Sequence, residues 1–102
     1  MNDSTLLAAT ARSPAALRVR LVYLARLREA LGCASETLEL TGVQDTTVAA
    51  ILDELRARGG AFAHELAAGR NFRVAVNHAM AGAETKVRSG DEVAILPPVT
   101  GG

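Results

Sequence analysis

The chain has 102 residues, a length that provides one small domain with its own hydrophobic core but not two domains. Its 11 Lys and Arg residues balance 11 Asp and Glu residues, so net charge gives no basis for binding nucleic acid or an anionic membrane. Hydrophobic residues make up 49% of the chain and charged residues 22%, which excludes a wholly disordered protein. We therefore expect a globular domain with no nucleic-acid or membrane partner.

Cysteine content and the start of the chain bear on its compartment. The single cysteine, Cys33, cannot form an internal disulfide, whereas a small secreted domain normally contains several. No run of 18 apolar residues occurs that could span a bilayer. The N-terminal segment carries Asp3 instead of a basic region, and Arg12 interrupts its apolar run, so it is a poor signal peptide. These features predict a cytoplasmic protein.

The first third of the chain predicts an arm, a strand and a helical turn. Residues 1–16 show no periodicity and read as a flexible N-terminal arm. From Leu17 to Tyr23 apolar and basic residues alternate, which is typical of a half-buried strand. Towards its end the alternation fails, because Val22 and Leu24 make the second face apolar as well. Residues 26–31 then predict a short helical turn that Gly32 stops.

The remainder predicts one principal helix among short strands. A second strand over residues 36–40 is expected to pair with the first. Thr47 can cap a helix whose apolar positions share one face, with basic residues up to Arg58 in its last turn and Gly59-Gly60 ending it. The pattern then fits a short helix over 61–68 and, in chain order, strands over 73–77, 83–87 (the weakest) and 92–96.

This order of elements predicts an α+β fold in which one main helix covers a mixed sheet of four to five strands. The first and last strands are apolar on two faces, which is expected of neighbours at the centre of a sheet. The arrangement is the β-grasp, or ubiquitin-like, fold. We expect a flexible arm over residues 1–16, a β-grasp domain over 17–98 and a projecting tail over 99–102.

Conventional catalytic and metal-binding patterns are absent from the sequence. His64 and His78 lie in different predicted elements, with no Cys or His at a spacing typical of a metal site. Cys33 has no partner motif, and neither Gly-Gly pair resembles a phosphate-binding loop. We therefore expect this chain to bind no metal and no cofactor, and not to be a self-contained catalyst.

The informative feature is the C-terminal sequence, GDEVAILPPVTGG. The last strand ends at Pro97-Pro98, which cannot donate to a sheet ladder and which hold the backbone extended. Gly101 and Gly102 follow, and glycine lacks the Cβ atom that would clash in a narrow active site. Such an end suits a terminal carboxylate that another protein activates, for example as an acyl-adenylate.

The sequence resembles the molybdopterin synthase small-subunit family (MoaD type), which are ubiquitin-like sulfur carriers. The resemblance covers residues 18–102 and rests on the segments LVYLARLRE, VAVN and GDEVAILPPVTGG. Pro-Pro-Val-Thr-Gly-Gly is its most specific element, because related carriers for thiamine or cysteine synthesis share Gly-Gly but usually not the double proline. The arm of about 16 residues departs from the family pattern and leaves the chemistry untouched.

The resemblance implies a mechanism in which this chain is more a co-substrate than an enzyme. A ubiquitin-activator-like adenylyltransferase would use ATP and Mg to adenylate the carboxylate of Gly102, and a sulfur donor protein would convert it to a thiocarboxylate. The large subunit of molybdopterin synthase would then accept the tail, in a heterotetramer, and the sulfur would pass to the cyclic pyranopterin precursor. Catalytic acid–base groups would belong to the large subunit.

The same resemblance implies which residues meet the partner. It places apolar contacts at Leu24, Met80 and Leu96. Further partner contacts follow along the tail at Pro97, Pro98, Val99 and Thr100, and Gly101 gives Gly102 access to the partner's active site. Ordinary sheet packing is the alternative explanation of the apolar positions. Two other functions also stay open: a β-grasp carrier or protein modifier of another pathway (thiamine, cysteine or tRNA thiolation), and an interaction module whose Gly-Gly end is incidental.

Overall fold

The computed structural model describes residues 16–97. The expected arm, apart from Ala16, and the expected tail over 99–102 lie outside the described residues, as does Pro98. The elements in chain order are β1 (Leu17–Tyr23), α2 (Arg26–Leu31), β2 (Ser35–Leu40), β3 (Asp45–Thr47), α3 (Val48–Arg56), α4 (Gly60–Glu65), β4 (Arg73–Val76), β5 (Ala79–Ala81), β6 (Lys86–Arg88) and β7 (Glu92–Leu96).

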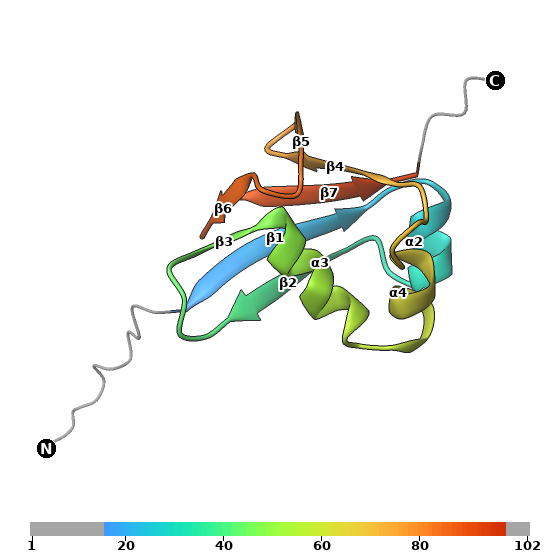
Figure 1. Ribbon diagram of the computed structural model, residues 1–102, viewed down its shortest axis with the longest axis horizontal. Helices are drawn as coiled ribbons and strands as arrows, with labels where there is room; N and C mark the ends of the chain where they lie inside the picture. The colour runs from blue at the N-terminus through green and yellow to red at the C-terminus, as the bar shows by residue number, and fades with distance from the viewer. Residues whose placement is uncertain (1–15, 98–102) are drawn as a thin grey trace, which may run out of the picture.

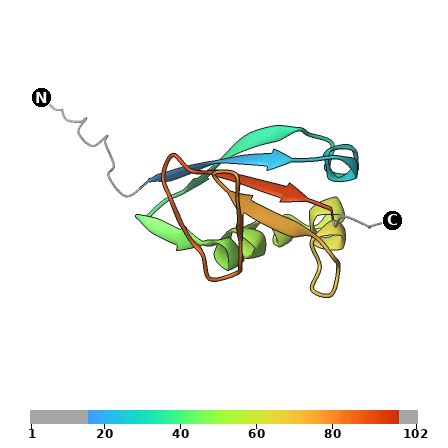
Figure 2. The same cartoon turned by 90° about the horizontal axis from the view of Figure 1, so that it is seen from above.

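The fold is the β-grasp arrangement that the order of elements predicts. A five-stranded sheet has the order β2-β1-β7-β4-β5 (Figure 1). Strands β1 and β7, from the two ends of the domain, run parallel at its centre, while the other pairs are antiparallel. The helix α3 packs across one face of this sheet, and Figure 2 shows it on a single side. The opposite face has no helix over it in the described part of the chain.

The core lies between α3 and the sheet. On α3 the buried residues Val48, Ile51, Leu52 and Leu55 occupy one face, at the spacing expected of an amphipathic helix. They meet the alternate residues of β1 that are fully buried, from Leu17 to Leu21. The Oγ1 atom of Thr47 accepts a hydrogen bond from the backbone N–H of Ala50 at 3.2 Å, so the predicted N-cap is confirmed.

The helix ends earlier than the sequence predicts. It stops at Arg56, with Ala57 as its C-cap, rather than continuing through Arg58. The chain then turns through Gly59, which has a φ of 78°, and Gly60 already begins α4, so the second helix is Gly60–Glu65 instead of 61–68. Arg58 lies in the turn after the helix, where its side chain binds Glu36 on β2.

Three short strands were predicted imperfectly or not at all. Strands β3 and β6 form a separate two-stranded sheet, whereas the sequence indicates only a strand over 83–87 and none at β3. Strand β5, which pairs with β4, was also not expected. Each has three residues, too few to show a period of two. Across residues 16–97, no helix is long and apolar enough to cross a membrane.

Candidate functional site

The C-terminal segment leaves the domain from the centre of the sheet. Strand β7 is held on one side by β1 and on the other by β4, and its last residue is Leu96. Pro97 follows and is half-buried. Residues 98–102, which include the predicted site residues Pro98, Val99, Thr100, Gly101 and Gly102, lie outside the described residues. The position from which they continue is therefore fixed by two strand neighbours.

The two faces of β7 have different roles. Val93 and Ile95 are buried at about 1% and 0% exposure and belong to the core, so Ala94 and Leu96 face the opposite side of the sheet. On that side the register places Ala94 between Val22 of β1 and Ala75 of β4. Met80 of β5 lies opposite Ala75, with 60% of its surface exposed.

Leu24 extends this apolar surface at the end of β1. Its backbone N–H donates to the carbonyl oxygen of Ile95 at 3.1 Å, so the pairing with β7 continues one residue beyond the strand. Leu24 and Leu96 are both half-buried, at the end of the sheet from which the chain leaves. We call the apolar residues on this face the outer patch: Val22, Leu24, Ala75, Met80, Ala94 and Leu96.

The structure thus places Leu24, Leu96 and Met80 on one face of the sheet, Leu24 and Leu96 beside each other and Met80 two strands away from β7. Sequence reasoning detected Val22 through its broken alternation. It missed Ala75 and Ala94, because alanine between larger apolar residues carries no signal of which face it occupies. The other half of the same face is charged, with Arg18, Arg20, Glu39 and Glu92 along the strands.

The Asn77 side chain, at the end of the VAVN segment, has a structural role. The side-chain amide of Asn77 donates to Oδ1 of Asp91 at 3.0 Å, and its carbonyl oxygen accepts the backbone N–H of Glu92 at 2.9 Å. Oδ2 of Asp91 accepts the backbone N–H of Arg88 at 2.8 Å. The hydrogen bonds from Arg88 and then Asn77 lower the pKa of Asp91 below its ordinary value. These contacts fix the turn that leads into β7.

Helices α2 and α4 lie at the end of the sheet where β7 ends (Figure 1). Oε1 of Glu65 on α4 accepts from Arg26 on α2 at 3.0 Å and from Arg70 at 3.3 Å. These two guanidinium groups, Arg26 first, lower the pKa of the Glu65 carboxyl. The pair Arg26–Glu65 therefore joins the two short helices beside the point of exit.

The remaining polar candidates do not assemble into a site. His64 lies on α4 and His78 in the turn between β4 and β5, where its φ of 73° is in the left-handed region. Cys33 is half-buried, and its Sγ atom lies 3.6 Å from the carbonyl oxygen of Ser35. Within residues 16–97, no group of three or more His, Cys, Asp or Glu side chains could hold a metal ion.

The sequence matches the ThiS family over residues 21–102, which is most of the chain and includes its C-terminus. The chain belongs to the ThiS family. A curated relative is the molybdopterin synthase sulfur carrier subunit of Haemophilus influenzae, which is 33% identical over 84 residues, covering 82% of this chain and 99% of that protein.

Solved structures support the ThiS-family assignment. The Haloferax volcanii HVO 2177 protein is 27% identical, with a TM-score of 0.72 over 86% of this chain and 89% of that one. The small archaeal modifier protein 1 of Methanosarcina acetivorans is 27% identical, with a TM-score of 0.65 over 85% and 98%. The BexX/CysO complex of Amycolatopsis orientalis contains a chain 29% identical, with a TM-score of 0.57 over 82% and 99%.

These likenesses establish the class of this ThiS-family chain. It is a β-grasp sulfur carrier or small modifier protein. The family match includes the Gly-Gly ending that follows β7, so the outer patch and the end of β7 are the candidate functional site.

Proposed function

We propose that this chain is the sulfur carrier subunit of molybdopterin synthase and acts in the cytoplasm. The observation that carries the proposal is the ending of the central strand β7, which continues into Pro97-Pro98-Val99-Thr100-Gly101-Gly102. The Haemophilus influenzae relative, matched over 99% of its length, supports the same assignment. A single cysteine in the chain agrees with a reducing compartment.

The proposed chemistry takes place on the carboxylate of Gly102. A carboxylate is a poor acyl donor, so the activating adenylyltransferase uses ATP and Mg to join it to AMP, with pyrophosphate leaving. A sulfur donor protein then supplies the sulfur that displaces AMP, and the product is a C-terminal thiocarboxylate. This chain provides the acyl group and its delivery, and the nucleotide and metal belong to the activating enzyme.

The proposed delivery uses the outer patch and the tail together. Leu24, Leu96 and Met80 pack against the large synthase subunit. Met80 is exposed and Leu24 and Leu96 are half-buried, and an accessible apolar surface on a small domain marks a partner site. Pro97 and Pro98 keep the chain extended. Val99 and Thr100 contact the partner, and Gly101 admits the thiocarboxylate of Gly102 to the narrow active site. There the sulfur passes to the cyclic pyranopterin precursor, and the assembly is a heterotetramer.

A reconstituted reaction tests the proposal. The chain, treated with adenylyltransferase, ATP, Mg and a sulfur source, is mixed with the large subunit and the pyranopterin precursor, and molybdopterin is measured. We expect molybdopterin to form with the intact chain and not with a chain that lacks Gly102. Formation of the thiocarboxylate without any molybdopterin would contradict this function while leaving the sulfur-carrier class intact.

A second candidate is a carrier or modifier of another pathway, such as thiamine, cysteine or tRNA thiolation. This second candidate is supported by the likeness to the small archaeal modifier protein 1 and to a chain of the BexX/CysO complex. The thiocarboxylated chain would then give no molybdopterin but would pass its sulfur to a different acceptor, or the adenylated chain would form an amide with a protein lysine as AMP leaves. Parallel assays with each acceptor separate the two candidates.

A further inference from the structure

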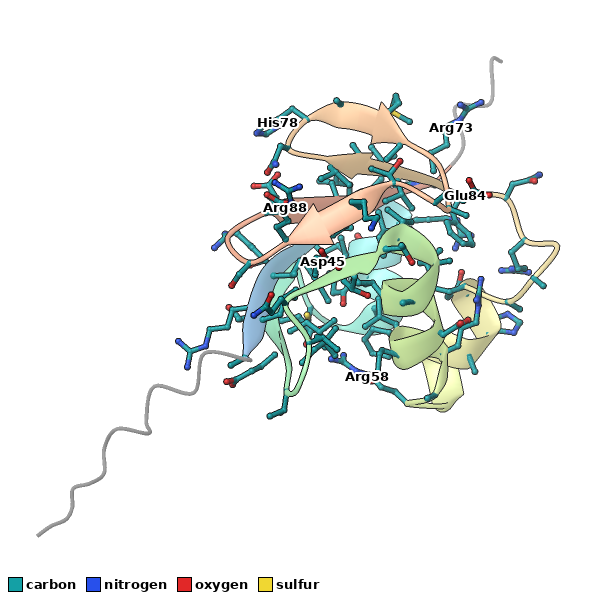
Figure 3. All side chains as sticks on the ribbon, turned by 60° about the vertical axis from the view of Figure 1, so that its left-hand side comes forward. Asp45, Arg58, Arg73, His78, Glu84 and Arg88 are labelled. Carbon is teal, nitrogen blue, oxygen red and sulfur yellow. The ribbon has the colours of Figure 1, made fainter. Side chains whose placement is uncertain are left out.

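Arg73 occupies an unusual position on the outer face of the sheet. It is the first residue of β4, is exposed, and pairs in register with Leu96 of β7. The register of β4 with β5 places Gly82, which has no side chain, on its other side. Arg73 therefore lies in the apolar half of that face, at the end of the sheet from which the chain leaves (Figure 3), and opposite Leu96 in the strand register.

No acidic side chain neutralises Arg73 within residues 16–97. Five other arginines in this range form ion pairs, namely Arg18, Arg26, Arg56, Arg58 and Arg70. Within residues 16–97 Arg73 forms none, like Arg20, Arg28 and Arg88, and Glu84, which is labelled in the same region of Figure 3, makes no ion pair with it. On the outer face the acidic residues Glu39 and Glu92 are in the charged half, several residues along their strands from this position.

An arginine at this position has a cost that a partner can offset. When the outer patch is covered, the guanidinium loses water on the side of Leu96, and an unpaired charge in such a place opposes binding. A carboxylate on the partner removes this penalty, because guanidinium and carboxylate form short, often bidentate hydrogen bonds. Arginine is accordingly enriched among the residues that dominate interface energies.

We propose that Arg73 is a specificity-determining contact, and that the protein which accepts the tail presents a carboxylate opposite it, at the rim of the apolar surface that meets Leu96. This inference rests on the proposed function, which names the large synthase subunit as that protein. It adds a requirement of charge: a large subunit with a neutral or basic residue at this point binds the chain poorly, even if its apolar surface fits.

Binding of the whole chain to the large synthase subunit of the same organism tests the inference. Isothermal titration gives Kd for the native chain, Arg73→Glu, Arg73→Gln and the control Lys86→Glu. Lys86 is also exposed and forms no ion pair within residues 16–97, but it lies on β6, outside the five-stranded sheet. Thermal unfolding of each variant serves as a check on the fold.

We expect Arg73→Glu to raise Kd by about tenfold or more, which corresponds to about 1.4 kcal/mol, while Lys86→Glu stays within about twofold. Binding of the native chain should weaken with added salt, and the Kd of Arg73→Gln should depend less on salt. Substituting a residue that only supports the fold would not change the salt dependence. Unfolding temperatures should match that of the native chain.

Two results would overturn the inference. Native-like binding by Arg73→Glu, or an equal loss with Lys86→Glu, would show that position 73 faces no carboxylate, and would leave the proposed function standing. Failure of the native chain to bind the large subunit would instead refute the proposed function, and this inference with it.

Discussion

At the scale of single residues, the most connected group is formed by Tyr23, Glu36 and Arg58. The hydroxyl of the buried Tyr23 donates to Oε2 of Glu36 at 2.6 Å, and Arg58 donates to both carboxylate oxygens at 2.8 and 3.0 Å. Arg58 also lies 4.7 Å from the ring centroid of Phe62, which packs edge-on against Tyr23. The cluster joins β1, β2 and the segment between α3 and α4.

This cluster makes stability depend on pH. The hydrogen bonds from Arg58, followed by that from Tyr23, hold the pKa of Glu36 below its ordinary value, while burial raises the pKa of Tyr23. A lowered folded-state pKa means that the stabilisation is complete above the unfolded value of about 4.3 and is lost as the pH falls through the folded value. We therefore expect acid to lower the unfolding temperature of the native chain more than that of Glu36→Gln.

Tyr23→Phe tests the hydroxyl separately. The ring remains buried and Glu36 keeps both bonds from Arg58, so we expect a loss of about 1–2 kcal/mol in the free energy of unfolding, measured in urea at neutral pH. A loss near zero would mean that the hydroxyl bond is replaced by water.

The sequence could not reveal this cluster. Glu36 and Arg58 are 22 residues apart in the sequence. Taken alone, Glu36 is typical of a solvent-exposed strand residue, and Arg58 is typical of a basic residue in the last turn of a helix. Only the fold brings them together. Leu24 and Leu96, in contrast, could be predicted as a pair, since both the broken alternation and the family resemblance point to the same face.

At the scale of elements, alternate residues of β7 have different roles: Val93 and Ile95 face the core, and Leu96 lies on the outer face. We expect Leu96→Glu to leave the unfolding temperature nearly unchanged and to weaken binding to the large subunit by about 2 kcal/mol or more, as for an interface anchor. Ile95→Glu on the same strand is the matched control, because Ile95 is fully buried and an unpaired carboxylate there should unfold the domain. Unfolding by Leu96→Glu would show that Leu96 belongs to the core.

The turn held by Asn77 provides a second test at this scale. Asn77 has a φ of 49°, a left-handed conformation that asparagine adopts at lower cost than alanine. Asn77→Ala loses the amide contacts and adds strain, so we expect a loss of about 1–3 kcal/mol in urea unfolding. Asn77→Gly loses only the contacts and should be less destabilised. Equal losses would show that the conformation at position 77 is not strained.

The short elements mark the limit of prediction from the sequence. Strands β3, β5 and β6 owe their existence to the partners that their backbones meet, such as Thr46 opposite Val87, and not to a pattern of their own. The long strand β1 and the amphipathic α3 were predicted because each has enough residues to show a period. On the outer face, the larger apolar residues Val22, Leu24 and Leu96 could be anticipated from the sequence. Ala75, Ala94 and Arg73 could not.

At the scale of the whole molecule, the fold works as a rigid base for its C-terminal segment. The parallel pair β1–β7 joins the two ends of the domain at the centre of the sheet. The strand that leads into the tail is the middle strand of five, with a neighbour on each side, and the outer patch lies on one face beside its end. This arrangement provides a fixed starting point for a segment whose last carbon must reach a partner's active site.

The central claim is that the carboxylate of Gly102 carries the sulfur. Each residue of extended chain moves the terminal carbon by about 3.3–3.6 Å, well beyond the roughly 0.5 Å tolerance of a reacting site. Deleting Gly102 should therefore abolish activation. Replacing Gly101 by Val should also abolish it, because a branched side chain would clash in a narrow active site. The unfolding temperature should stay the same, because these residues follow the last strand and are remote from the core in sequence.

Intact-mass spectrometry after incubation with adenylyltransferase, ATP, Mg and a sulfur source tests this claim most directly. The native chain should gain the mass difference between sulfur and oxygen, localised to its C-terminal peptide, and the chain lacking Gly102 should gain nothing. The activating enzyme must first be shown to be active on the carrier protein that it normally uses. With such an enzyme, an unchanged mass of the native chain would contradict the account, and so would an equal gain of mass in the truncated chain.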